Sequence, residues 1–336
     1  MKIAVTGASG LLGSYLVFKL AQKGICVHAL YRHETSLEWT FRIWKKIFGA
    51  EKDQPLITWI KGDILRDWDV LHTFLHDCEV LIHGASVSPS SKESTTYMYK
   101  NIVQGTQIIL DLAQGNRNMK KIIGISCGSA LIDKENSQKL EDKSDKESYF
   151  QKYKKRQALE FHRVYAEGMN ASVVHLPFLL GYGNWHYGSC QVFRDLWYQN
   201  IPKVHDYFMI ADVRDAADYI ARLATDSEDS REHLTFTKAC GVNFSQLLNL
   251  AQTMFTNHNS MTCGKSNCPQ KIKYLLHYRN HFKTYENLLS RFIKNQDSDE
   301  NFTHSDHDES LQYAREMLEF YLPLYREDFI NFSRGI

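Results

Sequence analysis

The chain has 336 residues, of which 43% are hydrophobic and 24% charged, and its formal net charge at pH 7 is +1. This composition is typical of a folded globular protein, and the balanced charge gives no overall attraction for nucleic acid or an anionic membrane. Seven cysteines, an odd number scattered along a long chain, favour reduced thiols in the cytoplasm over a disulfide framework. No apolar run reaches transmembrane length, so we expect no membrane partner.

The first predicted element is a short buried strand, Ile3–Val5, which passes through a glycine-rich turn into a helix that covers Tyr15–Ala21. Gly7 permits the tight turn, Gly10 lets backbone N–H groups approach a pyrophosphate, and Gly13 lets the helix pack closely on the strand. The turn therefore predicts a dinucleotide site. The contacts predicted at this turn are Gly7, Ser9, Gly10, Leu11 and Gly13.

The spacing of Thr6, Gly7, Gly10 and Gly13 resembles that of the short-chain dehydrogenase/reductase superfamily. Length and later motifs resemble its extended branch, the NAD-dependent epimerase/dehydratase family, and most nearly its dihydroflavonol-reductase-like members. The resemblance covers about two thirds of the chain. It implies an α/β fold, a doubly wound parallel (Rossmann) sheet with a smaller C-terminal substrate region. It also implies a small-molecule substrate and leaves a homodimer open.

The second strand, Ile25–Leu30, ends close to Arg32, with no acidic residue before Glu34. A carboxylate at this position would bind the ribose hydroxyls of NAD, whereas an arginine accommodates the 2′-phosphate of NADP. We therefore predict that NADP(H) is preferred and keep NAD(H) as an alternative, because Arg32 could also be an ordinary solvated residue.

Two further strands, Leu56–Ile60 and Val80–His83, are each followed by predicted cofactor contacts. Asp63 and Ile64 match the turn that the family places near the adenine, although Asp63 could equally serve as a turn residue. Ala85 lies where relatives pass small residues under the cofactor. His83 is expected to be a packed histidine at the strand end.

A helix is predicted over Leu37–Phe48 from its apolar spacing, and another begins near Asn101. The stretch from Asn101 to Thr106 resembles a family helix whose asparagine helps to hold the catalytic lysine through water. Gly105 and Thr106 also have a structural explanation, because a small residue there favours close helix packing.

The catalytic positions depart from the family pattern, in which a serine or threonine, a tyrosine and a lysine four residues later act together. After the strand Ile122–Ile125, the alignment places Cys127 rather than Ser126 at the hydroxyl position, and a thiol is a weak hydrogen-bond donor. No Tyr-x-x-x-Lys occurs in this region. The register counted back from Arg163 to Asn170 pairs Phe150 with Lys154.

Two alternatives remain open at this helix. A register anchored on Glu160 gives Lys152 and Arg156, which is no more competent. Tyr149 could replace the missing acid only if the helix were distorted, because one residue turns a side chain by about 100°. The predicted catalytic set is thus Ser126, Cys127, Lys154 and, as a rescuer, Tyr149.

A sixth strand, Ala171–Leu176, leads to Pro177, where relatives cross the nicotinamide end of the cofactor in a loop. We expect residues 1–177 and a returning segment of about 205–237 to form the dinucleotide domain. Residues 178–204 and 238–336 would form the substrate region, with the aromatic stretch Gly181–Val192 as its lining. Cys263 and Cys268 lack a second thiol pair nearby, so we predict no metal.

Two functions fit these residues. The first is an NADP-dependent oxidoreductase or epimerase that acts on a carbonyl or secondary alcohol. The second is a catalytically impaired cofactor-binding sensor or scaffold, which Phe150 and Cys127 favour. The basic and aromatic residues of Lys271–Phe292 are explained by helical packing, so nucleic acid is not predicted as a partner.

Overall fold

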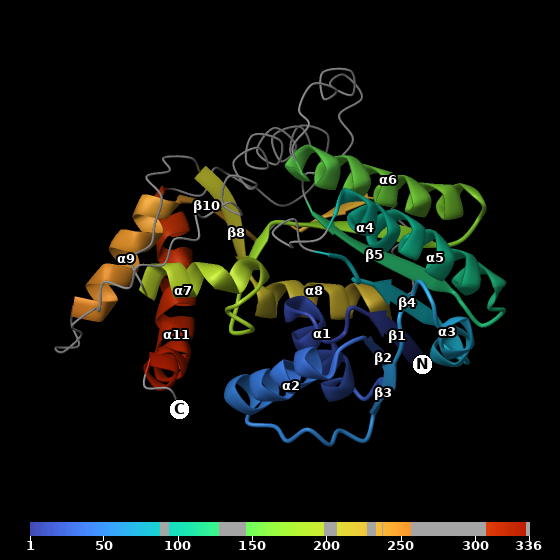
Figure 1. Cartoon of the computed structure of the whole chain (residues 1–336), viewed down its shortest axis with the longest axis horizontal. Helices are drawn as coiled ribbons and strands as arrows, with labels where there is room; N and C mark the ends of the chain where they lie inside the picture. Colours follow the sequence, from blue (N-terminus) through green and yellow to red (C-terminus); the bar gives the residue numbers. More distant parts are fainter. Residues whose placement is uncertain are drawn as a thin grey trace. The chain divides into compact units, whose positions relative to one another are not determined.

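The computed structural model describes residues 1–87, 94–127, 146–197, 207–226, 233–236, 238–256 and 307–333. The chain divides into two compact units (Figure 1). Unit 1 comprises Met1–Leu176 and Val213–Thr237, and unit 2 comprises Pro177–Asp212 and Lys238–Ile336. The sequence places the return to the first unit near residue 205, whereas residues 207–212 form a strand that pairs within unit 2. Cys263, Cys268 and Lys271–Phe292 lie outside the described residues.

Unit 1 contains a seven-stranded sheet in the order β3-β2-β1-β4-β5-β6-β9, with every neighbouring pair parallel. The strands are β1 (Lys2–Thr6), β2 (Cys26–Tyr31), β3 (Ile57–Lys61), β4 (Val80–His83), β5 (Lys121–Cys127), β6 (Ala171–Leu176) and β9 (His233–Thr235). The predicted doubly wound fold is confirmed. Its strand order reverses between β1 and β4, and ligands of such sheets bind beside the carboxyl ends of the strands at this point.

Helices cover both faces of this sheet (Figure 1). One layer contains α1 (Leu11–Gln22), α2 (Glu34–Ile43) and α8 (Val213–Thr225). The other contains α3 (Trp68–Leu75), α4 (Thr95–Tyr99), α5 (Gly105–Gly115) and α6 (Lys146–Ala166). The helix predicted over Leu37–Phe48 is present, although its last turn, Trp44–Phe48, is a π-helix. A second π-helical turn, Lys100–Gln104, joins α4 to α5.

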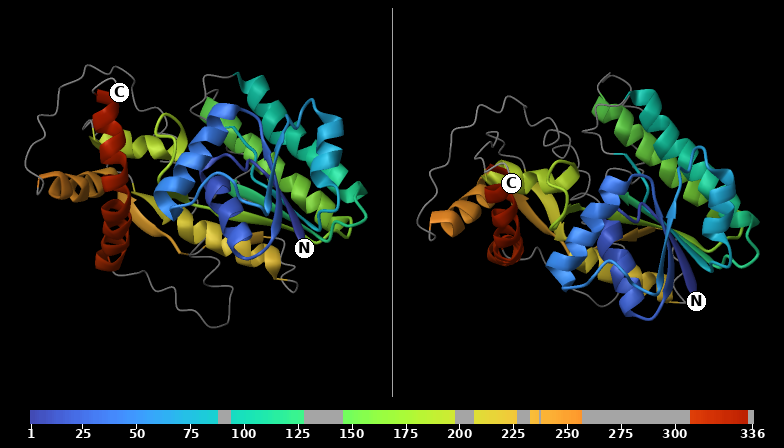
Figure 2. Two further views of the ribbon diagram at one scale, coloured as in Figure 1. Left: turned by 90° about the horizontal axis from the view of Figure 1, so that it is seen from below. Right: turned by 60° about the horizontal axis from the view of Figure 1, so that its bottom comes forward.

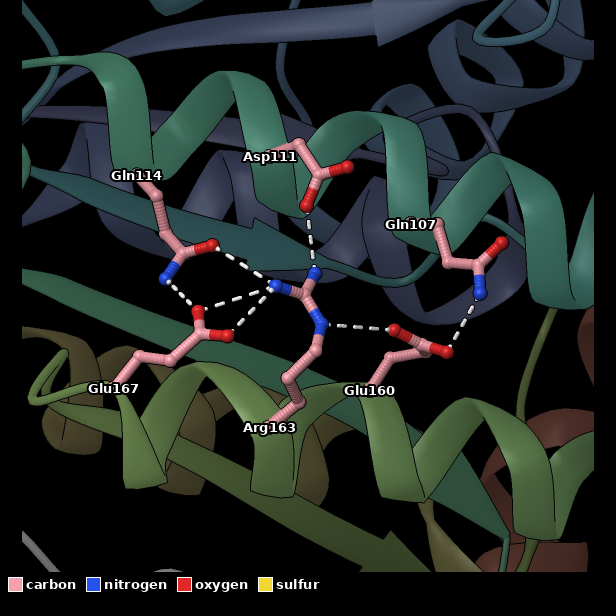
Figure 3. A network of polar contacts seen from close by, with 6 residues as sticks. All are labelled: Gln107, Asp111, Gln114, Glu160, Arg163 and Glu167. Atoms are coloured by element: carbon pink, nitrogen blue, oxygen red, sulfur yellow. Dashed lines mark hydrogen bonds and ion pairs between the residues drawn. The ribbon is translucent and has the colours of Figure 1, made fainter.

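Arg163 of α6 connects α5 and α6 on the outer side of this layer (Figure 3). Its guanidinium contacts Asp111 at 2.6 Å, Glu160 at 3.2 Å and Glu167 at 3.1 Å. The Gln114 amide donates a hydrogen bond of 2.7 Å to Glu167, which closes the network. The carboxylates hold the pKa of Arg163 above its usual value, against the opposing effect of partial burial.

We expect Arg163→Met to lower the free energy of unfolding by about 1 kcal/mol, because partly exposed charge networks contribute little more than this. Urea unfolding should show the loss, and 1 M salt should reduce the difference between variant and wild type, since salt screens exposed charges. A difference that does not change with salt would mean that the methylene stem of Arg163, and not its charge, provides the stabilisation.

Unit 2 contains a three-stranded sheet in the order β10-β8-β7, formed by Phe178–Leu180 (β7), Tyr207–Asp212 (β8) and Cys240–Asn243 (β10). Its helices are α7 (Gln191–Trp197), α9 (Phe244–Thr256) and α11 (His307–Ser333), and Figure 2 shows their arrangement. The first three residues after Pro177, Phe178–Leu180, are therefore paired in a strand, and the irregular stretch begins at Gly181. Strand β7 lies parallel to β8, with Phe178 opposite Ile210.

The aromatic residues predicted to line a substrate site instead fill the core of unit 2. Tyr182 is buried and donates a hydrogen bond of 2.7 Å to the buried carboxylate of Asp328 on α11. Trp185 is also buried and packs edge-on against Phe329. Of the aromatic residues in Gly181–Val192, Tyr187 is the exposed one, at 72%. The aromatic content of this stretch is thus explained largely by packing.

Candidate cofactor and catalytic site

The glycine turn of unit 1 lies at the switch point of the sheet, between β1 and the loop after β4. Gly7 has φ +70°, and a Cβ at this position would lie 2.7 Å from the carbonyl carbon of Gly84. A Cβ on Gly13 would lie 2.2 Å from the Gly7 carbonyl oxygen. Both positions therefore require glycine for the turn itself to fold.

Gly10 differs from the other two glycines of the turn. A Cβ there would meet the Gly7 carbonyl oxygen at 3.2 Å, a tight but tolerable contact, and its backbone has no positive φ. Gly10 precedes α1, whose first turn, starting at Leu11, carries no acidic side chain. A helix N-terminus free of acidic groups favours an anion. The open space at Gly10 therefore fits the pyrophosphate of a dinucleotide.

Three predicted cofactor residues meet at the end of β2. Nη1 of Arg32 donates a hydrogen bond of 3.1 Å to Oδ1 of Asn101 and lies 3.9 Å from Oδ2 of Asp63. Asp63 also accepts a hydrogen bond of 2.9 Å from the Leu65 backbone N–H, so it is a turn residue as well as a neighbour of Arg32. This arrangement aims a cation at the place expected for the adenosine ribose.

A hollow of about 790 Å³ opens beside this cluster. Its lining residues include Arg32, Asp63, Leu65, Arg66, Tyr97 and Asn101. Ile64, which the sequence assigns to the adenine, packs partly buried against the sheet core, and its neighbour Leu65 lines the hollow instead. The assignment of Ile64 to the adenine stays a prediction, and Leu65 is a neighbouring side chain that lines the hollow.

Lys154 of α6 is 5% exposed and has fixed partners at the other end of the site. Its ammonium donates to Oε1 of Gln157 at 2.6 Å and to Oγ of Ser86 at 3.3 Å. Burial lowers the pKa of Lys154, and the nearby Cys127 thiol opposes this shift. Asn101, expected to hold this lysine, is engaged with Arg32 and with the Tyr97 carbonyl oxygen. Gln157 and Ser86 are thus the partners that the sequence motifs did not predict.

The carboxyl end of β5 brings Ser126 and Cys127 to the same edge of the sheet. Ser126 is 5% exposed, and within the described part of the chain its hydroxyl has no hydrogen-bond partner. Buried hydroxyls without a partner are uncommon, and this one lies next to Cys127 at the end of β5. Cys127 is half-buried and packs against an apolar cluster of Met98, Ile102, Val103 and Phe150.

Phe150 is 6% exposed within this cluster, one helical turn before Lys154. The spacing of four residues puts both side chains on one face of α6. Tyr149 is 38% exposed, and its ring lies 6.0 Å from that of Tyr153, which in turn packs against Tyr99. Tyr149 therefore packs toward Tyr153, which itself lies against the cluster that contains Phe150. The undistorted helix does not bring Tyr149 to the face that carries Lys154.

The remaining predicted contacts are divided between the two units. Ala85 donates its backbone N–H to Oγ1 of Thr6 at 3.2 Å, directly beside the glycine turn. Ser9 bonds to Ser36 of α2 at 3.0 Å. Pro177 is the first residue of unit 2. Among the described residues no group of three or more His, Cys, Asp or Glu side chains could hold a metal ion, and no described helix is long and apolar enough to cross a membrane.

The fold and this site define a nucleotide-binding protein of the Rossmann class. Residues 3–233 match the model of the NAD-dependent epimerase/dehydratase family. The match covers more than half of the chain, so the protein belongs to this family. The resemblance found in the sequence motifs is therefore confirmed.

Distant curated relatives include dehydrogenases and reductases. A decarboxylating sterol-4-alpha-carboxylate 3-dehydrogenase of Dictyostelium discoideum is 24% identical over 253 residues, which cover 69% of this chain and 70% of the relative. A bifunctional dihydroflavonol 4-reductase/flavanone 4-reductase of Malus domestica is 26% identical over 144 residues, 43% of this chain and 40% of the relative.

Solved structures show the same fold at low identity. An epimerase of Methanothermobacter thermautotrophicus gives a TM-score of 0.66 at 17% identity, over 97% of this chain and 94% of that one. Vestitone reductase of Medicago sativa gives 0.58 at 17% identity, over 94% of this chain and 98% of that one.

Proposed function

We propose that the protein binds NADP(H) in unit 1 and carries out oxidoreductase or epimerase-type chemistry on the carbonyl or secondary alcohol of a small molecule. The observation that carries this proposal is the buried Lys154, held by two hydrogen bonds at the sheet edge that also presents the glycine turn. The two curated relatives reported above are a dehydrogenase and a reductase, which supports a redox reaction.

Each residue has a role that its surroundings support. Gly10 and the N-terminus of α1 would receive the pyrophosphate, and Lys154 would bind the nicotinamide ribose. When bound, the nicotinamide supplies or accepts a hydride. The free hydroxyl of Ser126 can donate to a ligand oxygen, a role that the Cys127 thiol fills poorly. A cytoplasmic location and a homodimer stay predictions.

A cofactor-binding sensor or scaffold is the second candidate, and a single observation favours it. In the register counted back from Asn170, Phe150 would take the position of the family's proton-donating tyrosine, and it is packed in an apolar cluster. Such a side chain neither donates nor accepts a proton, so turnover would be slow even with the cofactor in place.

We expect wild-type protein to bind NADPH at least tenfold more tightly than NADH, because the Arg32 guanidinium can pair with the 2′-phosphate. Arg32→Ala should remove this preference and leave NADH affinity nearly unchanged. Isothermal titration calorimetry of both nucleotides measures the effect. Arg66→Ala is the control, since Arg66 lines the same hollow, whereas the side-chain contacts to Asn101 and Asp63 come from Arg32. Equal affinities of the wild type for the two nucleotides would refute the assignment.

A further inference from the structure

Gln157 connects Lys154 to the rest of unit 1 through both ends of its amide. The side chain is 1% exposed. Its Oε1 accepts the hydrogen bond of 2.6 Å from Lys154, and its Nε2 donates one of 2.9 Å to Oγ1 of Thr106 on α5. The amide orientation is therefore fixed, because an ammonium can only donate and Lys154 requires the oxygen.

Thr106 fixes the direction of the next hydrogen bond. Its hydroxyl donates 2.7 Å to the Ile102 carbonyl oxygen, so the single proton is used. The oxygen has two lone pairs left, and one accepts from Gln157. Nε2 of His83 lies 2.9 Å from Oγ1 of Thr106, so His83 must donate the hydrogen of this bond to the remaining lone pair. His83 is therefore the tautomer that carries its proton on Nε2.

The chain of hydrogen bonds ends at the glycine turn. Nδ1 of this His83 tautomer is an acceptor, so Oγ1 of Thr6, 2.7 Å away, donates to it. The same Thr6 oxygen accepts the Ala85 backbone N–H at 3.2 Å. Thr6 is the last residue of β1 and directly precedes Gly7. Burial and the charge of Lys154 lower the pKa of His83 to about 3, which keeps the imidazole neutral and the direction of each bond unchanged near neutral pH.

We propose that Gln157 is a positioning residue, which fixes the Lys154 ammonium relative to the glycine turn through Thr106, His83 and Thr6. This inference rests on the proposed function, in which Lys154 binds the nicotinamide ribose. Two of the three ammonium hydrogens are taken by Gln157 and Ser86, so the third has one remaining direction. An amide does not pass a proton along, so the chain sets geometry and does not conduct protons.

The test compares NADPH with adenosine 2′,5′-bisphosphate, which lacks the nicotinamide ribose. Gln157→Met keeps the length of the side chain and removes both hydrogen bonds. We expect it to weaken NADPH binding about tenfold and to leave the bisphosphate affinity unchanged. Gln157→Glu, which still accepts from Lys154 but can no longer donate to Thr106, should recover only part of the loss. Gln114→Met, which removes an amide from the outer network between the same two helices, should change neither affinity.

An equal loss for both ligands, or no loss for NADPH, would overturn the proposal. A measurement without ligand tests the chain itself. The ¹⁵N spectrum of histidine-labelled protein, assigned with His83→Asn, should show a neutral Nε2–H tautomer from pH 5 to 8. Gln157→Met should shift this signal and Gln114→Met should not. If wild-type protein binds neither ligand, the proposed function fails. If the His83 imidazole titrates between pH 5 and 8, or carries its proton on Nδ1, the proposed chain of hydrogen bonds is contradicted independently of ligand binding.

Discussion

Phe150→Tyr is expected to raise NADPH-dependent reduction of a panel of aldehydes and ketones by about 100-fold, the lower end of what general acid catalysis contributes. The physical reason is that position 150 shares a face of α6 with Lys154, so a phenol there would be one helical turn from the ammonium. Absorbance at 340 nm follows the reaction. Phe150 is buried among Met98, Ile102 and Val103, so circular dichroism must first show that the tyrosine variant folds.

Adding Cys127→Ser should raise the rate further, and by more than the product of the single effects, because the hydroxyl and the phenol would act on one oxygen. Tyr149→Phe is the control, since Tyr149 is exposed and packs toward Tyr153 rather than beside Lys154. If Tyr149→Phe abolished a robust wild-type activity, Tyr149 would be the acid. A folded Phe150→Tyr protein that binds NADPH and reduces no member of the panel faster than wild type would contradict the assignment of position 150.

The second large effect is expected at the glycine turn. Gly10→Val should weaken NADPH binding by at least 100-fold, because the branched side chain would occupy the space that the pyrophosphate enters. The protein should stay folded, since a Cβ at Gly10 meets a single neighbouring atom, at 3.2 Å. The same substitution at Gly7 or Gly13 would disrupt the turn itself and would test folding rather than binding.

Gly115→Val is the matched control, because a Cβ on Gly115 meets no atom within 4 Å. We expect its NADPH affinity to equal that of the wild type. Calorimetric titration gives the affinities, and thermal unfolding shows whether each variant is folded. If the folded Gly10→Val variant still bound NADPH as tightly as the wild type, the assignment of the glycine turn as the pyrophosphate site would be contradicted.

The framework of unit 1 could be predicted from sequence because its signals are local. Val80–His83 and Ala171–Leu176 are buried apolar runs, and the structure gives strands with the same bounds. The glycine turn is equally local, because its spacing and flanking elements are read within a dozen residues. Buried parallel strands of this kind are continuous apolar runs, which separates them from the amphipathic helices between them.

The partners of the site residues could not be predicted in the same way. The family resemblance implies that Asn101 helps to hold Lys154 through water, and it gives no sign that Asn101 accepts a hydrogen bond from Arg32, which is 69 residues away along the chain. Lys154 bonds to Gln157, whose other end reaches Thr106, 51 residues away. Which side chains become hydrogen-bond partners depends on how each helix is rotated over the sheet. A glutamine that will bond to a site residue has no sequence motif that identifies it. The one local feature that indicates the bond between Lys154 and Gln157 is their i,i+3 spacing on α6.

The order of segments in unit 1 has a consequence for how the chain is synthesised. Strand β9 pairs with β6, but residues 177–212 of unit 2 are made between them. Until residue 233 has left the ribosome, β6 is an open sheet edge with unpaired N–H and C=O groups, a surface prone to mispairing. The nascent chain must therefore keep a nearly complete sheet unfinished while the first, shorter segment of unit 2 is translated. Slow translation of this stretch would prolong the interval in which the edge can aggregate.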